Sequence, residues 1–180
     1  FTDTHCHIYK EYYEDIEKIV ENAKENKVDR MINNGCNHTS NKEVLDLIEK
    51  YDCMFASLGI HPESVDTYKE EELKFLEENL NDPKVIAIGE IGLDYHYTKE
   101  NKDTQKKLFE DQLKIAEKHN LPVIIHSREA TEDTINTLKK YKLEPKEMKF
   151  VYPKKGKNAN LVLIKSIKNA KEFLIVKEPL

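Results

Sequence analysis

The chain has 180 residues and a mass of 21.1 kDa, which suits one hydrophobic core of ordinary size, so we expect a single domain over 1–180. Charged residues make up 35% and hydrophobic residues 38%, and no apolar run approaches the roughly 20 residues of a membrane-spanning helix, which argues against a membrane protein or a disordered chain. The formal net charge is -5, so bulk charge offers no attraction for nucleic acid or for an anionic membrane.

The cysteines indicate a reducing environment. Cys6, Cys36 and Cys53 are three in number and cannot all pair, and the N-terminus has no secretory-signal pattern. We therefore expect a cytoplasmic protein with no membrane association and no obligate protein partner. The sequence opens on Phe1 inside an apolar run, without an initiator methionine, which leaves the natural start of the protein open.

Short apolar runs alternate with amphipathic segments as far as about residue 152. The runs are too short for buried helices and several are rich in valine and isoleucine, so we predict strands at 1–7, 28–33, 53–58, 85–89, 122–126 and 148–151. Between them, apolar residues at helical spacing predict helices around 12–23, 73–80, 108–116 and 135–138, with lysine and glutamate facing solvent.

This alternation is typical of βαβ units in a parallel sheet, either an open doubly wound sheet or a closed barrel. No G-x-G-x-x-G follows the first strand, so a dinucleotide-binding open sheet has no support. Unusual polar residues instead end one strand after another, and in a barrel these ends meet at one mouth. They are His5, His7, Asn34, His61, Glu90, Asp94 and His126. We therefore predict an α/β fold, a TIM-type (β/α)8 barrel.

The length conflicts with a complete barrel, which needs about 250 residues. Six strands are clear in the sequence, and an ambiguous tail follows them. We therefore expect the barrel to be incomplete or altered in its last two units.

His5 and His7 are candidate metal ligands. They are two residues apart on a strand, so their side chains point to one face and Cys6 points to the other. Two imidazoles at a rigid strand end suit a divalent metal, and Asp3 is placed to accept a hydrogen bond from an imidazole N–H. Two half-exposed histidines without a metal are the alternative.

Glu90 and His126 end two further apolar strands. A carboxylate at such a position must be paired with a cation or bind a metal. His126 follows a buried run, and Arg128 lies two residues later. Taken singly, Glu90 is explained equally well by a salt bridge, and His126 by a histidine packed in the core. Because both residues are expected on one rim of the barrel, a shared site is favoured.

These groups suit two divalent ions, Mg, Mn or Zn. With Glu90 bridging, His5 and His7 hold one ion and His126 helps to hold a second, about 3.5–4 Å away. Such a pair lowers the pKa of a bound water to about 7 and clamps the attacking and leaving oxygens of a phosphodiester displacement. Together with Arg128, two cations would neutralise phosphate locally although the surface is acidic.

Four segments closely resemble the TatD-related deoxyribonucleases, metal-dependent hydrolases with an amidohydrolase-type barrel. They are Asp3-Thr4-His5-Cys6-His7, Gly59-Ile60-His61-Pro62, Gly89-Glu90-Ile91-Gly92-Leu93-Asp94-Tyr95 and Pro122-Val123-Ile124-Ile125-His126-Ser127-Arg128-Glu129-Ala130. They follow the family order and family-like spacing over 1–145. The resemblance implies a (β/α)8 barrel that uses divalent metal to hydrolyse DNA, often as a 3′-to-5′ exonuclease.

The resemblance also implies roles for individual residues. His5 and His7 match ligands of one metal, Glu90 matches the bridging ligand, and His126 matches a ligand of the other metal. His61 and Arg128 match rim positions, where their chemistry suits contact with phosphate. We therefore expect Glu90 and Arg128 to be catalytic, and His61 and Arg128 to bind substrate.

The segment 146–180 departs from the family. The family has a His followed by a Phe-Ser-Gly-like turn after its sixth strand, and near its last strand a Glu-Thr-Asp segment whose Asp ligates metal; this chain has neither, and no histidine follows His126. The segments 160–167 and 173–179 are either a helix and a last strand, with Glu178 near the place of that Asp, or unrelated sequence. Three explanations stay open: residues omitted from the chain, a truncated or altered gene product, or a variant with a depleted metal site. Because two missing units leave open sheet edges, omitted or replaced sequence is favoured over a stable six-strand monomer.

A metal-dependent deoxyribonuclease is the leading interpretation, with two alternatives. One is a related hydrolase of a small amide, lactone or phosphoester; Glu90 argues against it, because it stands where such enzymes often carry a modified bridging lysine. The other is a catalytically impaired barrel, which the missing His and Asp support.

Overall fold

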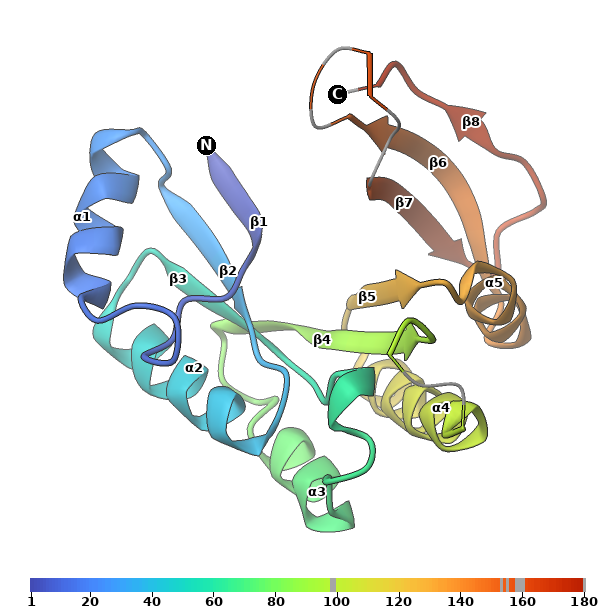
Figure 1. Cartoon of the computed structure of the whole chain (residues 1–180), viewed down its shortest axis with the longest axis horizontal. Coiled ribbons are helices and arrows are strands. Elements are labelled where there is room, and N and C mark those ends of the chain that lie inside the picture. The colour runs from blue at the N-terminus through green and yellow to red at the C-terminus, as the bar shows by residue number, and fades with distance from the viewer. Residues whose placement is uncertain (98–99, 153, 155, 158–160, 180) are drawn as a thin grey trace. The chain divides into compact units, whose positions relative to one another are not determined.

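The computed structural model describes residues 1–97, 100–152, 154, 156–157 and 161–179 (Figure 1). The chain forms two compact units, Phe1–Thr131 and Glu132–Leu180. Each unit has a sheet of its own. The expectation of a single domain over 1–180 stays a prediction.

The first unit is built on a parallel sheet of five strands in the order β1-β2-β3-β4-β5. The strands are β1 Thr2–Cys6, β2 Arg30–Asn34, β3 Met54–Leu58, β4 Val85–Asp94 and β5 Val123–Arg128. Every strand pairs with the next one along the chain, as in a barrel, whereas a doubly wound sheet reverses its strand order at a central strand. The first five predicted strands are therefore present in the order that the barrel prediction requires.

Helices connect these strands: α1 Ile16–Glu25, α2 His38–Lys50, η1 Pro62–Ser64, α3 Glu70–Glu78 and α4 Lys102–His119. The periodicity had predicted α1, α3 and α4 and missed α2. The signal for α2 was present, because Val44, Leu47 and Ile48 are buried at helical spacing. A capping box starts the helix: the Asn37 side chain accepts from the backbone N–H of Ser40, and the Ser40 hydroxyl accepts from that of Asn37.

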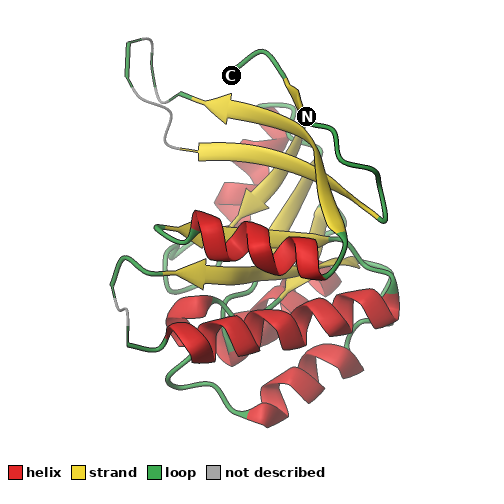
Figure 2. Cartoon of the chain, turned by 90° about the vertical axis from the view of Figure 1, so that its right-hand side faces the viewer, coloured by secondary structure: helices red, strands yellow, loops and turns green. Residues whose placement is uncertain are grey.

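The core of the first unit lies between these helices and the sheet, and Figure 2 shows the layered helices and strands. Its fully buried side chains include Val44, Leu58, Ile88, Leu93 and Phe109. Each such side chain contributes about 1.5–3 kcal/mol on burial. Buried polar residues end the strands, and these ends form the site described below.

The second unit begins at Glu132, within α5 (Thr131–Lys140), and continues with a sheet in the order β7-β6-β8. The strands are β6 Leu143–Val151, β7 Leu161–Lys168 and β8 Ile175–Val176. The strand predicted at 148–151 is part of β6. It pairs antiparallel with β7 and parallel with β8, whereas the sixth strand of a barrel would pair in parallel with the fifth.

The helix considered for 160–167 is wrong, because 161–168 form β7; residue 160 lies outside the described residues. The run Leu161–Lys168 is rich in β-branched and leucine residues and pairs along the length of β6. The last strand considered within 173–179 is present as β8. In the described part of the chain, no helix has the length and apolar character to cross a membrane.

Candidate metal centre

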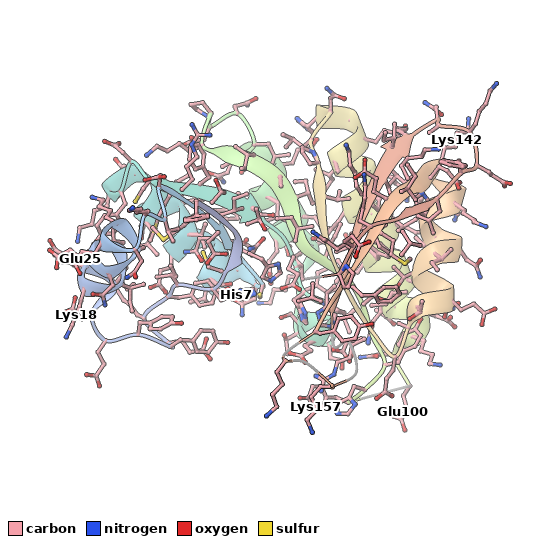
Figure 3. All side chains as sticks on the ribbon, turned by 90° about the horizontal axis from the view of Figure 1, so that it is seen from above. His7, Lys18, Glu25, Glu100, Lys142 and Lys157 are labelled. Atoms are coloured by element: carbon pink, nitrogen blue, oxygen red, sulfur yellow. The ribbon has the colours of Figure 1, made fainter. Side chains whose placement is uncertain are left out.

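The four predicted metal ligands meet at the carboxyl end of the first unit's sheet. His5 and His7 come from the end of β1, Glu90 from β4 and His126 from β5; His7 is labelled in Figure 3. Nε2 of His5 and Nε2 of His7 each lie 3.2 Å from Oε2 of Glu90, and Nδ1 of His126 lies 3.3 Å from its Oε1. One carboxylate therefore faces three imidazoles.

The spacing of the first group fits a shared cation. The two Nε2 atoms of His5 and His7 are 3.0 Å apart, and both are 3.2 Å from the same Glu90 oxygen. Ligands bound about 2.1 Å from one tetrahedral or octahedral ion lie about 3.0–3.4 Å from each other. Two imidazole nitrogens and a carboxylate suit Zn²⁺ or Mn²⁺.

The ring of His7 is fixed by groups that the sequence reasoning missed. Its Nδ1 donates to the backbone carbonyl of Asn34 at 3.1 Å, which leaves Nε2 as the nitrogen that faces Glu90. The Tyr9 hydroxyl donates to the same carbonyl. Tyr9 lies two residues after His7 and beyond the end of β1, so strand alternation gave no signal for it.

Two neighbours of His7 hold a proton on its ring. The Cys36 thiol, whose Sγ lies 3.7 Å from Nδ1, and the Glu90 carboxylate raise the pKa of His7 to about 10. Asp3, expected to accept from an imidazole, instead accepts the backbone N–H of His5 at 3.1 Å. The reason is that its short side chain turns back onto its own strand.

Glu90 is buried in a position that only a glycine before it permits. A Cβ atom at Gly89 would lie 2.7 Å from Cβ of Ile124 and 2.8 Å from Oγ of Ser57. Burial by itself raises the pKa of the Glu90 carboxyl, but hydrogen bonds from His126, His5 and His7 outweigh it and hold the pKa well below its ordinary range. Glu90 is therefore a carboxylate with both oxygens directed at imidazoles.

Asp94 fixes the orientation of the His126 ring. Nε2 of His126 donates to Oδ2 of Asp94 at 2.8 Å, which leaves Nδ1 as the nitrogen that faces Glu90. Asp94 is itself fixed, because its Oδ1 accepts the backbone N–H of His96 at 2.8 Å and the Gln105 amide pairs with its backbone N–H and carbonyl, both at 2.8 Å. Burial lowers the pKa of His126, and the bonds to Glu90 and Asp94 raise it by more.

His61 also lies at this centre. Its ring centroid is 4.4 Å from that of His126. Its Nδ1 accepts the backbone N–H of Glu63 at 3.2 Å, and burial together with His126 lowers its pKa to about 4. The ring is therefore neutral at pH 7 with its proton on Nε2, which suits a hydrogen-bond donor better than a metal ligand.

Arg128 lies at the end of β5, and among the described residues its side chain makes no contact with the four candidate ligands. In the β4–β5 register it is opposite Asp94. Its Cζ lies 4.9 Å from the ring centroid of Tyr97, and Tyr97 raises the pKa of the guanidinium. Among the described residues, the side-chain groups with ligand spacing are His5–His7–Glu90 and His61–Glu90–His126. Glu178, in the second unit, stays a prediction.

Comparison with known proteins gives the same family that the sequence motifs resemble. The family described as TatD related DNase matches residues 2–160. The chain is 43% identical over 138 residues to the uncharacterized metal-dependent hydrolase YabD of Bacillus subtilis, covering 76% of this chain and 54% of that protein. It is 36% identical over 156 residues to deoxyribonuclease Tat-D of Schizosaccharomyces pombe, covering 79% and 47%. The chain thus spans about half the length of the curated relatives it matches.

Solved structures give the same result for the fold. The crystal structure of YjjV, a TatD homologue of Escherichia coli, is similar with a TM-score of 0.72 and 33% identity, over 78% of this chain and 55% of that one. A TatD family hydrolase of Entamoeba histolytica has a TM-score of 0.68 and 26% identity, over 78% and 54%. These likenesses confirm the predicted barrel class, with the five parallel strands as an incomplete (β/α) barrel.

Proposed function

The chain belongs to the TatD related DNase family, and from that membership we propose that it is a divalent-metal-dependent hydrolase of DNA phosphodiester bonds. The observation that carries the proposal is Glu90, whose two oxygens face the imidazoles of His5 and His7 on one side and His126 on the other. A relative of 36% identity is named a deoxyribonuclease. The geometry and the name support the same chemistry.

In this proposal His5, His7 and Glu90 would hold one divalent ion, and Glu90 and His126 would help to hold a second. When bound, the two ions, Mg, Mn or Zn, supply Lewis acidity and lower the pKa of water at the centre. Glu90 would be catalytic because its carboxylate belongs to both candidate ligand groups. Asp94 and the Asn34 carbonyl are positioning groups, because they hold the ring protons of His126 and His7 away from the centre.

His61 and Arg128 would bind the scissile phosphate. The Nε2–H of His61 donates to a non-bridging oxygen, and the guanidinium of Arg128 suits a bidentate contact with the same group. The reaction is hydrolysis: a water oxygen bonds to phosphorus and loses a proton, the ester bond to the leaving oxygen breaks, and that oxygen gains a proton in its place. Removal of nucleotides in the 3′-to-5′ direction is the finer part of the proposal, and it rests on the family resemblance.

The test uses single-stranded DNA labelled at its 5′ end, incubated with Mg²⁺ or Mn²⁺ and, separately, with EDTA. We expect shortening of the labelled strand only with metal, and its loss in Glu90→Ala. Glu78→Ala is the matched control, because Glu78 forms a surface ion pair with Lys74 on α3, and it should cleave as the wild type does. Metal-replete protein that leaves DNA intact would contradict the proposal.

A catalytically impaired barrel is the second candidate. Within the described first unit, the ion beside His126 would be held by His126 and Glu90, and His61 is the other side chain at ligand spacing. Metal analysis separates the two candidates: an intact centre binds two ions per chain, and fewer than one indicates the impaired form. A hydrolase of small amides, lactones or phosphoesters would be identified by substrate profiling.

We also propose a cytoplasmic location, because Cys6, Cys36 and Cys53 are free thiols.

A further inference from the structure

A pocket of about 360 Å³ lies beside the metal centre, within the first unit. It is lined by Glu63, Asp66, Asp94, Tyr97, Asn101 and Gln105. Asp94 belongs to both places, because its side chain lines the pocket and also accepts the hydrogen bond of His126. The pocket therefore begins one side chain away from the metal ligands.

The polar wall of the pocket is held by its own hydrogen bonds. Nδ2 of Asn101 donates to Asp66 at 2.9 Å, and Nε2 of Gln105 donates to Oδ1 of Asn101 at 2.8 Å. Gln105 is 1% exposed and also pairs with the backbone of Asp94. The wall is thus preformed, as small-molecule sites usually are.

Tyr97 supplies a flat aromatic surface at this pocket. Its side chain is 68% exposed, which is unusual for a large aromatic residue. Arg128 lies over its ring, with Cζ 4.9 Å from the centroid. An exposed aromatic ring beside a cation is the arrangement that binds a nucleobase by stacking and its phosphate by charge.

The charge of the pocket determines which part of a nucleotide it accepts. Three of the six lining residues are carboxylates and none is basic, so the pocket repels phosphate and accepts N–H donors. Its volume is at the lower end of the roughly 300–1,000 Å³ of ligand pockets, which suits a single base. Adenine, cytosine and guanine carry an exocyclic amino group, and thymine does not.

We propose that this pocket binds the base of the nucleotide whose phosphate lies at the metal centre, stacked on Tyr97, and that its carboxylates favour bases with an exocyclic amino group. The inference deepens the proposed function and rests on it. It makes Tyr97 the stacking residue and Glu63 and Asp66 the residues that select the base.

The test measures binding and cleavage separately. Binding of deoxyadenosine and thymidine monophosphates to metal-loaded protein is measured by ligand-observed NMR, and cleavage is measured on oligonucleotides that differ only in the terminal base. We expect tighter binding of the adenine nucleotide and faster removal of amino-bearing bases. Tyr97→Leu should weaken adenine nucleotide binding about tenfold, since a stacked base contributes a factor of roughly this size. Tyr97→Phe keeps the ring and is the matched control, with an expected change under about twofold.

The outcomes distinguish this inference from the proposed function. Wild-type protein that cleaves DNA while Tyr97→Leu binds both nucleotides as the wild type does would overturn the pocket and leave the nuclease. Selective nucleotide binding without cleavage of any DNA would support the pocket and overturn the nuclease. Asp66→Asn should reduce the preference for adenine over thymine; if it lowers the number of bound Mn²⁺ ions instead, the pocket is a cation site and the inference fails.

Discussion

Asp94→Asn tests whether a buried carboxylate sets the metal affinity of His126. Asp94 is 2% exposed and uses both of its oxygens, one toward the backbone N–H of His96 and one toward Nε2 of His126, each at 2.8 Å. Asparagine offers one acceptor oxygen for these two donors. If the amide oxygen of the asparagine keeps the hydrogen bond from the backbone N–H of His96, its NH₂ group faces Nε2–H of His126. The ring proton of His126 then moves to Nδ1, the nitrogen that faces Glu90.

The size of the effect follows from the lost hydrogen bond. A buried donor left without its acceptor costs about 1–3 kcal/mol, and changes to groups that orient a metal-binding histidine cost about 10–100-fold in affinity. We therefore expect Asp94→Asn to weaken one of two binding events about 10–100-fold, or about 1.4–2.8 kcal/mol. The event assigned to His5 and His7 should stay within about twofold, because their rings do not depend on Asp94.

Isothermal titration with Zn²⁺ or Mn²⁺ gives the stoichiometry and both affinities. Asp111→Asn is the control, because it makes the same chemical change on α4, where Asp111 pairs with Lys107 and Lys114. Two unchanged binding events in folded Asp94→Asn protein would refute the tautomer argument. Equal weakening of both events would also refute it, because the two ions would then not be held by separate histidine groups.

Three further predictions concern protons, backbone and helix capping. The raised pKa of His7, about 10, means that a bound metal must displace its proton at pH 7, so the apparent Zn²⁺ affinity should rise by up to about tenfold per pH unit from pH 7 to 9 in calorimetric titrations; a flat profile would show that His7 is not a ligand. Gly92→Ala should destabilise by about 3 kcal/mol or more in urea unfolding, because φ is 138° and the new Cβ would lie 2.0 Å from the carbonyl oxygen of His126. Gly156→Ala, also at positive φ but with no atom of the described residues within 4 Å, should cost about 1 kcal/mol, and equal losses would contradict the packing argument. Asn37→Ala should cost about 1 kcal/mol through the cap of α2, and no change in urea midpoint would show that the capping box contributes nothing.

The ligand set was predictable from sequence because each ligand lies at the end of a short run that predicts a strand. His5, Glu90 and His126 lie in the carboxyl-terminal halves of β1, β4 and β5, and the parallel sheet brings these halves together. The structure places these three groups within hydrogen-bond distance of one another through Glu90. Local pattern and sheet topology together were enough, and no knowledge of side-chain rotamers was needed.

The groups that orient the ligands were harder to predict. The acceptor for His7 is the backbone carbonyl of Asn34, 27 residues away, and backbone carbonyls carry no sequence signal. Asp3 was the expected partner by proximity along the chain, but its carboxylate accepts from a backbone amide instead. The strand β7 was missed for a related reason, since its run also has apolar residues at helical spacing and its pairing with β6 decides the outcome.

The charge around the strand ends connects the composition to the proposed chemistry. Glu63, Asp66, Glu90 and Asp94 place four carboxylates near the centre and its pocket, and Arg128 is the guanidinium beside them. This local excess has the same sign as the net charge of -5, so neither the surface nor the centre attracts a phosphodiester by itself. Two divalent cations would add four positive charges at Glu90 and reverse the sign there, while Glu63 and Asp66 would keep the pocket acidic. A nucleotide then has one orientation that satisfies both fields, with its phosphate toward Glu90 and its base toward Tyr97.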